Sequence, residues 1–231
     1  MMRHYLWMSP VERDDPTKAD GPIPAGRFSE WATQMRHALG DGQDAEVPCG
    51  SCSGCCTASQ FVHIGPDEVD ALAHIPSELL FPAPRSPDGH VLLGYDERGH
   101  CPMLADGKCS IYAHRPRTCR TYDCRVFAAA GVAPAGAQQV AIGRRVRRWR
   151  FTYADPDDRV QHEAVVVAAR YLGEHVEDLP GAATPAGRAV LAFEIHHLFL
   201  AFDAVTRAWT LRQPEPDIVR SRLAALGAAG A

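Results

Sequence analysis

Long apolar runs are missing from this sequence of 231 residues. No stretch approaches the ~20 residues that an apolar helix needs to cross a bilayer, so we predict that the protein has no membrane partner. The first ten residues also lack the apolar core and the small-residue cleavage site of a secretory signal. We therefore expect a cytoplasmic location, in which cysteine thiols stay reduced.

A surplus of basic charge is missing too. The chain holds 24 lysines and arginines against 28 aspartates and glutamates, which argues against a general nucleic-acid binder. With 46% hydrophobic residues, the composition is that of a globular protein rather than a disordered one. Phosphate-binding loops, dinucleotide fingerprints and serine nucleophile elbows are absent, so the common motifs assign no enzyme class.

What the sequence does contain is eight cysteines confined to one segment. None precedes Cys49 and none follows Cys124. In a reducing compartment such a cluster binds metal more often than it forms disulfides, so we predict that the cysteines are metal ligands. The candidate ligands are Cys49, Cys52, Cys55, Cys56, Cys101, Cys109, Cys119 and Cys124.

Three regions differ in composition. Residues 1–24 hold four prolines and little apolar periodicity, so we predict a flexible segment. Residues 25–135 are predicted to form a cysteine-cluster metal-binding domain, and the alanine-rich residues 136–231 a helical region that packs on it. The expected fold class is α+β, with a small metal-stapled unit of short strands followed by an α-helical C-terminal part.

Local patterns predict individual elements within these regions. Apolar residues at helical spacing predict a helix over 28–39. Residues 61–64 and 91–95 are candidates for short strands. The dipeptide Asp106-Gly107 predicts a tight turn, and Thr184-Pro185 predicts the start of a helix.

The first four cysteines form a Cys-x2-Cys-x2-Cys-Cys run with glycine and serine between them. Glycine admits the backbone conformations that let thiolates of a tight loop converge on one centre. The spacing equals the first three ligands of a bacterial ferredoxin run, whose fourth ligand is remote and precedes proline, as Cys101 precedes Pro102. Our hypothesis is one centre formed by Cys49, Cys52, Cys55 and Cys101, and a second formed by Cys56, Cys109, Cys119 and Cys124.

These motifs resemble the CxxCxxCC, or YkgJ-type, family of cysteine-cluster proteins, a zinc- or iron-chelating domain. The resemblance rests on the run from Cys49 to Cys56, on Gly94-Tyr95-Asp96, on Cys101-Pro102, and on the stretch from Cys109 to Cys124 with its Ile-Tyr-x-x-Arg-Pro core. It implies metal chelation without fixing a reaction. Some members are labelled Fe–S oxidoreductases and the flagellin lysine N-methylases share a related cluster, which implies a redox or group-modifying enzyme as the alternative.

The metal stays open between iron–sulfur and zinc. Ferredoxin-like spacing with a Cys-Pro pair favours a [4Fe–4S] cluster, whereas glycine-bearing Cys-x2-Cys loops suit a closed tetrahedral zinc site. Thiolates accept both metals. We favour at least one iron–sulfur cluster, with zinc as the alternative. His63, His100 and His114 could each replace a cysteine, although eight cysteines require no histidine.

Basic and aromatic residues crowd the last cysteines. Either kind of centre is anionic when its thiolates outweigh the metal charge, so cations should lie nearby. We predict Arg115, Arg117, Arg120 and Arg125 for this role, and the alternative is that they pair with Asp106 and Asp123 or lie at the surface. Tyr112 and Tyr122 are candidates for contact with the cofactor, either as packing aromatics or in a redox role.

Five arginines fall within Arg144–Arg150, beside an apolar stripe at helical spacing formed by Ile142, Val146, Trp149 and Tyr153. One interpretation is the solvated face of a helix. The other is a surface for an anionic partner, either an acidic protein or a nucleic acid that stacks on Trp149. The second interpretation would make the protein a metal-stabilised adaptor.

Overall fold

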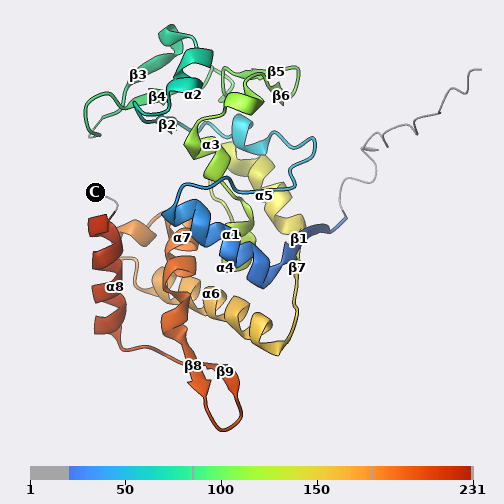
Figure 1. The fold of residues 1–231 in the computed structure, drawn as a ribbon, viewed down its shortest axis with the longest axis vertical. Coiled ribbons are helices and arrows are strands. Elements are labelled where there is room, and N and C mark those ends of the chain that lie inside the picture. The colour runs from blue at the N-terminus through green and yellow to red at the C-terminus, as the bar shows by residue number, and fades with distance from the viewer. Residues whose placement is uncertain (1–20, 85, 178, 230–231) are drawn as a thin grey trace, which may run out of the picture.

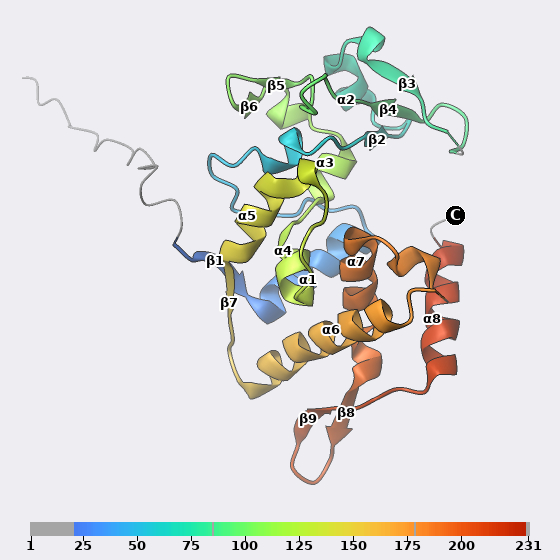
Figure 2. The same ribbon diagram turned by 180° about the vertical axis from the view of Figure 1, so that it is seen from behind.

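A helical body and a smaller cysteine-rich part are stacked on one another (Figure 1), and the view from behind shows the same two parts (Figure 2). The structure is a computed structural model that describes residues 21–84, 86–177 and 179–229. We call residues 49–124 the cysteine lobe and the other described residues the helical body.

Helices dominate the helical body, whereas the cysteine lobe consists of short elements. The elements of the body are β1 (Ile23–Arg27), α1 (Phe28–Gly40), α4 (Arg125–Ala130), η5 (Ala137–Gln139), α5 (Val140–Arg148), β7 (Trp149–Thr152), α6 (Pro156–Glu174), η6 (Pro180–Ala182), α7 (Pro185–Ile195), η7 (His196–Phe199), β8 (Leu200–Asp203), β9 (Ala208–Leu211) and α8 (Pro216–Ala229). Those of the lobe are η2 (Gly54–Thr57), β2 (Val62–Ile64), α2 (Val69–His74), η3 (Ser77–Leu79), β3 (Leu80–Pro82), β4 (Val91–Leu93), β5 (Leu104–Ala105), β6 (Lys108–Cys109), η4 (Tyr112–His114) and α3 (Arg117–Thr121). This mixture, with a helical C-terminal part after the cysteines, confirms the predicted α+β class.

The core of the body is built by α1, α4, α6 and α7. Phe28 and Trp31 of α1 are fully buried, and the Trp31 ring lies 5.2 Å from the ring of Phe193 on α7. Buried alanines on α6 and α7 let these helices approach closely. The helix predicted over residues 28–39 is confirmed as α1. α7 begins after Thr184, whose side chain caps the helix as predicted.

A parallel pair of strands joins the beginning of the body to the segment after α5. β1 pairs with β7, and Ile23 lies opposite Trp149. Ile23 and Pro24 are therefore strand residues, although they belong to the segment predicted to be flexible; residues 1–20 of that segment lie outside the described residues. The buried side chains of residues 28–40 belong to the core of the body and not to the buried cluster of the cysteine lobe.

The cysteine lobe buries few apolar side chains. Its three-stranded antiparallel sheet has the order β2-β4-β3, which confirms the strands predicted near 61–64 and 91–95. A separate hairpin joins β5 to β6 through the predicted turn, where Asp106 and Gly107 have φ values of 49° and 74°. The buried cluster of the lobe consists of Ile64, Ile75, Leu93 and Ile111.

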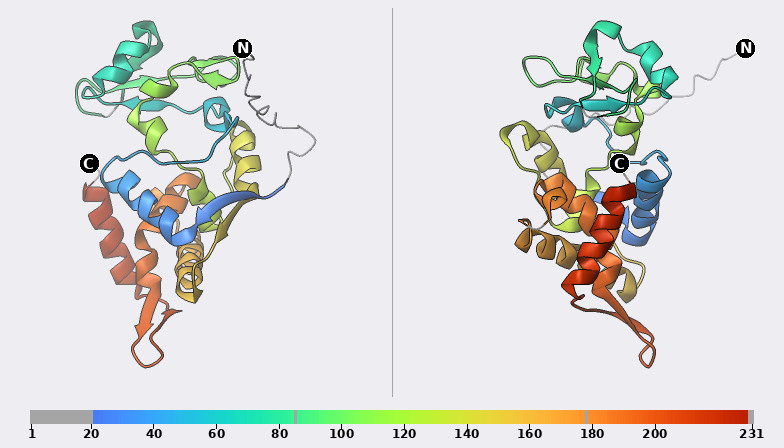
Figure 3. Two further views of the ribbon diagram at one scale, coloured as in Figure 1. Left: turned by 45° about the vertical axis from the view of Figure 1, so that its right-hand side comes forward. Right: turned by 90° about the vertical axis from the view of Figure 1, so that its left-hand side faces the viewer.

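The C-terminal part departs from the predicted pattern after α5. The helix ends at Arg148 and β7 begins at Trp149, so Trp149 and Tyr153 do not continue the helical stripe. Further along the chain, β8 and β9 form a hairpin that projects from the body (Figure 3). No helix among the described residues is both long enough and apolar enough to span a bilayer.

Candidate metal centre

Several segments of the cysteine lobe carry the eight cysteines. The first four lie in η2 and just before it, Cys109 lies on β6, Cys119 on α3, and Cys124 directly before α4. Cys101 donates its backbone N–H to the carbonyl of Cys56 at 2.8 Å, which joins the middle of the lobe to η2. All eight cysteines are free thiols.

Cys49, Cys52 and Cys124 form a first thiol group. Burial raises the pKa of the Cys124 thiol to about 12, and the nearby charges of Cys49 and Cys52 contribute to the rise. The indole Nε1 of Trp149 donates to the Sγ of Cys124 at 3.3 Å. The backbone N–H of Gly54 donates to the Sγ of Cys52 at 3.5 Å. Such N–H donors stabilise sulfur that carries negative charge.

Cys56, Cys101, Cys109 and Cys119 form a second thiol group. Burial raises the pKa of the Cys119 thiol to about 12, and the charges of Cys101 and Cys109 contribute. Burial also raises the pKa of Cys101, and the charge of Cys109 adds to that rise. The pKa of Cys56 is raised chiefly by its hydrogen bond to Cys55, and again by the charges of Cys101 and Cys109. These four thiols are therefore close enough to repel one another when ionised.

Cys55 lies between the two groups. Its Sγ is 4.0 Å from the Sγ of Cys56, and the Cys56 thiol donates a hydrogen bond that lowers the pKa of Cys55 to about 7. Successive side chains of a 3₁₀-helix point about 120° apart, yet the two adjacent sulfurs of η2 remain close enough to interact. The charge of Cys55 contributes to the raised pKa of both Cys49 and Cys119.

The two groups differ from the expected allocation by an exchange of two cysteines. The spacing argument assigns Cys101 to the centre of Cys49 and assigns Cys124 to the centre of Cys56. The fold instead ties the backbone of Cys101 to Cys56 and brings Cys124 next to Cys49 and Cys52. The physical reason is that Cys124 leads into α4, on the side of the lobe where β7 supplies Trp149.

A family model matches the segment that contains both thiol groups. It covers residues 48–133 and is described as "CxxCxxCC: putative zinc- or iron-chelating domain". Residues 48–133, called the CxxCxxCC domain below, are similar to this family. The match confirms the resemblance seen in the sequence and supports metal chelation, but it names no reaction. Comparison with curated proteins and with solved structures gave no match.

Two arginines bring positive charge to the CxxCxxCC domain, one beside each thiol group. Arg145 of α5 offsets part of the rise in the pKa of Cys49. Arg115 has the same effect on the pKa of Cys119. The guanidinium of Arg115 lies 3.8 Å from the centre of the Tyr112 ring, which holds it in place. Each group of thiols thus has a cation that would oppose its negative charge.

Arg120 and Arg125, also predicted to compensate charge, have aspartate partners of their own. Arg120 forms an ion pair with Asp44 and donates to the carbonyl of Arg115 at 3.0 Å. Arg125 pairs with Asp123, and the two side chains are only 5% and 1% exposed. Pairing with an aspartate, the alternative interpretation of these arginines, describes both residues.

The two tyrosines of the CxxCxxCC domain lie in different environments. Tyr122 is inside: burial raises its pKa, and the charges of Cys124 and Cys55 add to the effect. Tyr112 is 63% exposed and lies under Arg115. Tyr122 is therefore near Cys124 and Cys55, whereas Tyr112 is linked to the second thiol group only through Arg115, whose charge acts on Cys119.

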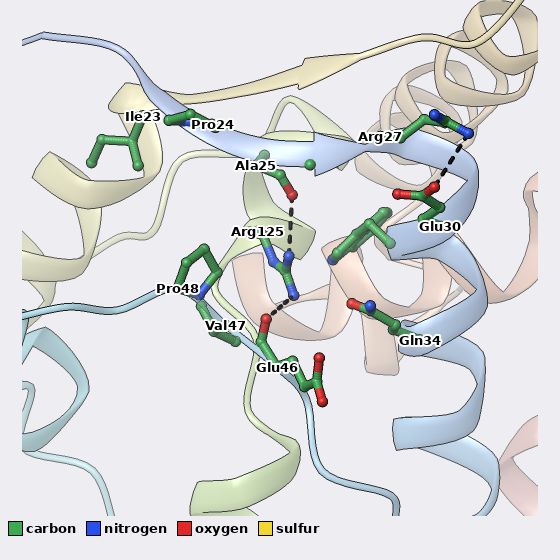
Figure 4. A pocket seen from close by; sticks show the side chains of 12 residues that line it. Ile23, Pro24, Ala25, Arg27, Glu30, Gln34, Glu46, Val47, Pro48 and Arg125 are labelled. Atoms are coloured by element: carbon green, nitrogen blue, oxygen red, sulfur yellow. Dashed lines mark hydrogen bonds and ion pairs between the residues drawn. The ribbon is translucent and has the colours of Figure 1, made fainter.

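A cleft of about 580 Å³ lies where the helical body meets the segment before Cys49 (Figure 4). It is lined by β1, by α1 and by the segment that leads to Cys49. Arg125 lies in this cleft and donates to the carbonyls of Ala25 and Glu46 at 3.1 and 3.2 Å. Pro48 and Arg125 of the lining are the chain neighbours of Cys49 and Cys124, and no cysteine itself lines the cleft.

Sequence reasoning did not identify Arg145 and Trp149 as neighbours of the cysteines. Arg145 also donates to the carbonyl of Pro48 at 2.6 Å, which fastens α5 to the chain just before Cys49. The strip of arginines over residues 144–150 is the only sequence feature that draws attention to these two residues, and by itself it indicates a surface rather than contact with cysteines. Local patterns could not show that α5 packs against η2.

The rest of the arginine strip has mixed roles. Arg148 donates to the carbonyl of Gly21 at 2.8 Å and so supports the fold. Arg144 is exposed and lines a second cleft together with Arg98 and His100. An anionic partner at Arg144–Arg150 stays a prediction, and Arg147 and Arg150 are exposed as Arg144 is.

Proposed function

We propose that this protein binds metal through two four-thiolate centres and that at least one of them holds an iron–sulfur cluster. The first centre would use Cys49, Cys52, Cys55 and Cys124. The second would use Cys56, Cys101, Cys109 and Cys119. The observation that carries the proposal is that seven of the thiols fall into two groups, within which the charge of one thiol raises the pKa of another. Cys55 interacts with members of both groups and would complete the group of three.

The donor set fits a metal. Clustered thiols resist ionisation because each thiolate repels the next, and a bound cation would remove that penalty. Four thiolates per centre match the ligand number of a four-cysteine zinc site and of a [4Fe–4S] cluster. When bound, zinc would supply a structural crosslink, and an iron–sulfur cluster would supply electron transfer as well.

Iron–sulfur is favoured over zinc by the spacing of the first three cysteines. The Cys101-Pro102 pair does not add to this argument, because Cys101 belongs to the second group. The N–H groups of Trp149 and Gly54, which point at sulfur, agree with this choice because hydrogen bonds to the sulfurs tune the potential of such clusters. Two zinc ions are the alternative. In either case we infer a cytoplasmic setting, where the thiols would stay reduced.

Anaerobic purification followed by iron, sulfide and zinc analysis and a visible spectrum tests this proposal. We expect brown protein with matching iron and sulfide. Colourless protein with two equivalents of zinc would overturn the iron–sulfur part and leave chelation standing. Protein with neither metal would overturn both.

Paired cysteine substitutions test the allocation. Cys49→Ser and Cys124→Ser should remove the same centre, and Cys101→Ser and Cys109→Ser the other one. Double variants decide the point: Cys49→Ser with Cys124→Ser should lose no more metal than either alone, whereas Cys49→Ser with Cys101→Ser should lose both centres. The reverse result would restore the allocation predicted from spacing.

A redox or group-modifying enzyme is the second candidate, and the observation that favours it is the cleft lined by Pro48 and Arg125, the chain neighbours of Cys49 and Cys124. Such an enzyme needs room for a substrate next to a centre. Gln34 of α1 lines the cleft, so Gln34→Trp should fill it. We expect this variant to keep its metal but to pass electrons more slowly from the reduced protein to an acceptor dye. An unchanged rate would argue against use of the cleft.

A further inference from the structure

A cluster of metal-ligating side chains lies apart from the cysteines, where α2 meets η4. Asp70 and His74 are four residues apart and share one face of α2. His114 of η4 completes the cluster, and one potential ligand atom from each residue lies within 4.8 Å of the others. We propose that Asp70, His74 and His114 bind a divalent transition-metal ion independently of the cysteines.

The three side chains are in contact before any ion binds. Nδ1 of His114 lies 2.9 Å from Oδ2 of Asp70, and Nδ1 of His74 lies 2.8 Å from the backbone carbonyl of Asp70. The imidazole rings of His74 and His114 are nearly parallel, with centroids 3.5 Å apart. Two segments that are 44 residues apart in the chain are thus already joined at this point.

Two imidazoles and one carboxylate form a ligand set for zinc, iron(II), nickel or copper rather than for calcium or magnesium. A metal ion lies in the plane of the imidazole that binds it, so the parallel rings must turn apart when the ion enters. They have room to do so, because the side chains of His74 and His114 are 42% and 38% exposed. Water can complete the coordination of an ion at such an open site.

A metal ion at this site would stabilise the cysteine lobe, whose buried apolar cluster is the smaller of the two. α2 and η4 both belong to the cysteine lobe, and Ile75 and Ile111 of its buried cluster directly follow α2 and precede η4. An ion held by both elements would stabilise the lobe, because it binds the folded arrangement and not the unfolded chain. The ligands are nitrogen and oxygen, so this stabilisation would not depend on thiols.

Calorimetric titration of the full chain, with its resident metal in place, tests the proposal with Ni²⁺ as the probe. We expect one Ni²⁺ to bind, and affinity to fall at least about tenfold in Asp70→Asn, His74→Ala and His114→Ala. His37→Ala is the matched control. His37 lies four residues before Asp41 on α1, at 2.9 Å from its carboxylate, and has no second histidine partner in any described contact.

Resident metal and free thiols are counted before and after the titration. Equal binding by all variants, no binding at all, or binding that releases the resident metal would each overturn the proposal. Proton NMR of the unmodified chain with Co²⁺ keeps the test decisive if a variant fails to fold. The ring signals of His74 and His114 should shift or broaden before those of His37, and the opposite order would also overturn it.

Discussion

In the helical body, α1, α4, α6 and α7 bury a continuous set of aromatic and aliphatic side chains around Trp31 and Phe193. In the cysteine lobe, strands of two or three residues surround a buried cluster of a few aliphatic side chains. Apolar burial scales with size, so a unit as small as the lobe gains little from it. The comparison teaches that the body can rely on its core, whereas the lobe needs ligands that crosslink it.

The two regions meet at Asp123. This residue precedes Cys124 of the first thiol group, accepts a hydrogen bond from the buried Trp31 indole at 2.9 Å, and pairs with Arg125. Its charge also contributes to the raised pKa of Cys49 and Cys124. One carboxylate therefore touches the core of the body and influences the thiols of the lobe.

Metal removal should produce the largest difference in stability between the two regions. We expect a chelator under reducing conditions to unfold the lobe while the body stays folded, because the ligands hold only the lobe together. Hydrogen exchange measured by mass spectrometry should show lost protection in β4 and retained protection in α6 and α7. Simultaneous loss in both regions, or in neither, would remove the distinction.

Asp123→Ala should have the next largest effect and act on the body as well as the lobe. It leaves the buried Arg125 without its ion-pair partner, and such a loss costs about 3–5 kcal/mol. The free energy of unfolding in urea measures the change. Asp217→Ala removes the partner of the exposed Arg220 and serves as the control, for which we expect no measurable change. Similar values for both variants would contradict a structural role of Asp123.

Trp149→Phe should weaken one thiol group and spare the other. The substitution keeps an aromatic ring at a buried position but removes the N–H that donates to Cys124. We expect metal to leave the first centre about tenfold faster, measured by transfer to a coloured chelator, while release from the second centre is unchanged. Trp209→Phe on the β9 strand of the hairpin is the matched control. Faster release from both centres would mean that the two groups are not independent.

Acidification should produce the smallest change in stability, and this change should arise in the helical body. Burial lowers the pKa of His162 and of His196, so the unfolded chain takes up protons more readily than the folded one. Stability is therefore constant above the ordinary histidine pKa of about 6.5 and falls as the pH drops below it toward the lowered values. Urea midpoints followed by the helical signal measure this. His162→Gln should reduce the fall, and a midpoint that rises on acidification would contradict the burial argument.

Elements set by neighbouring residues could be predicted from the sequence. The Thr184 cap, the α1 helix and the Asp106-Gly107 turn each depend on contacts within a few positions of the chain. The pairing of β1 with β7 could not be predicted, because it joins segments more than a hundred residues apart. The same limit hid Arg145 and Trp149, whose contacts with Pro48 and Cys124 depend on where α5 packs.

By itself, the sequence determined the chemistry of this protein: eight thiols within a CxxCxxCC pattern, on a segment whose predicted elements are short. Only the tertiary structure decided which thiols share a group, with Cys101 beside Cys56 and Cys124 beside Cys52, and which arginine faces each group. The physical reason is that charges interact according to their distance in space, whereas residue spacing along the chain determines that distance only within a single loop or helix.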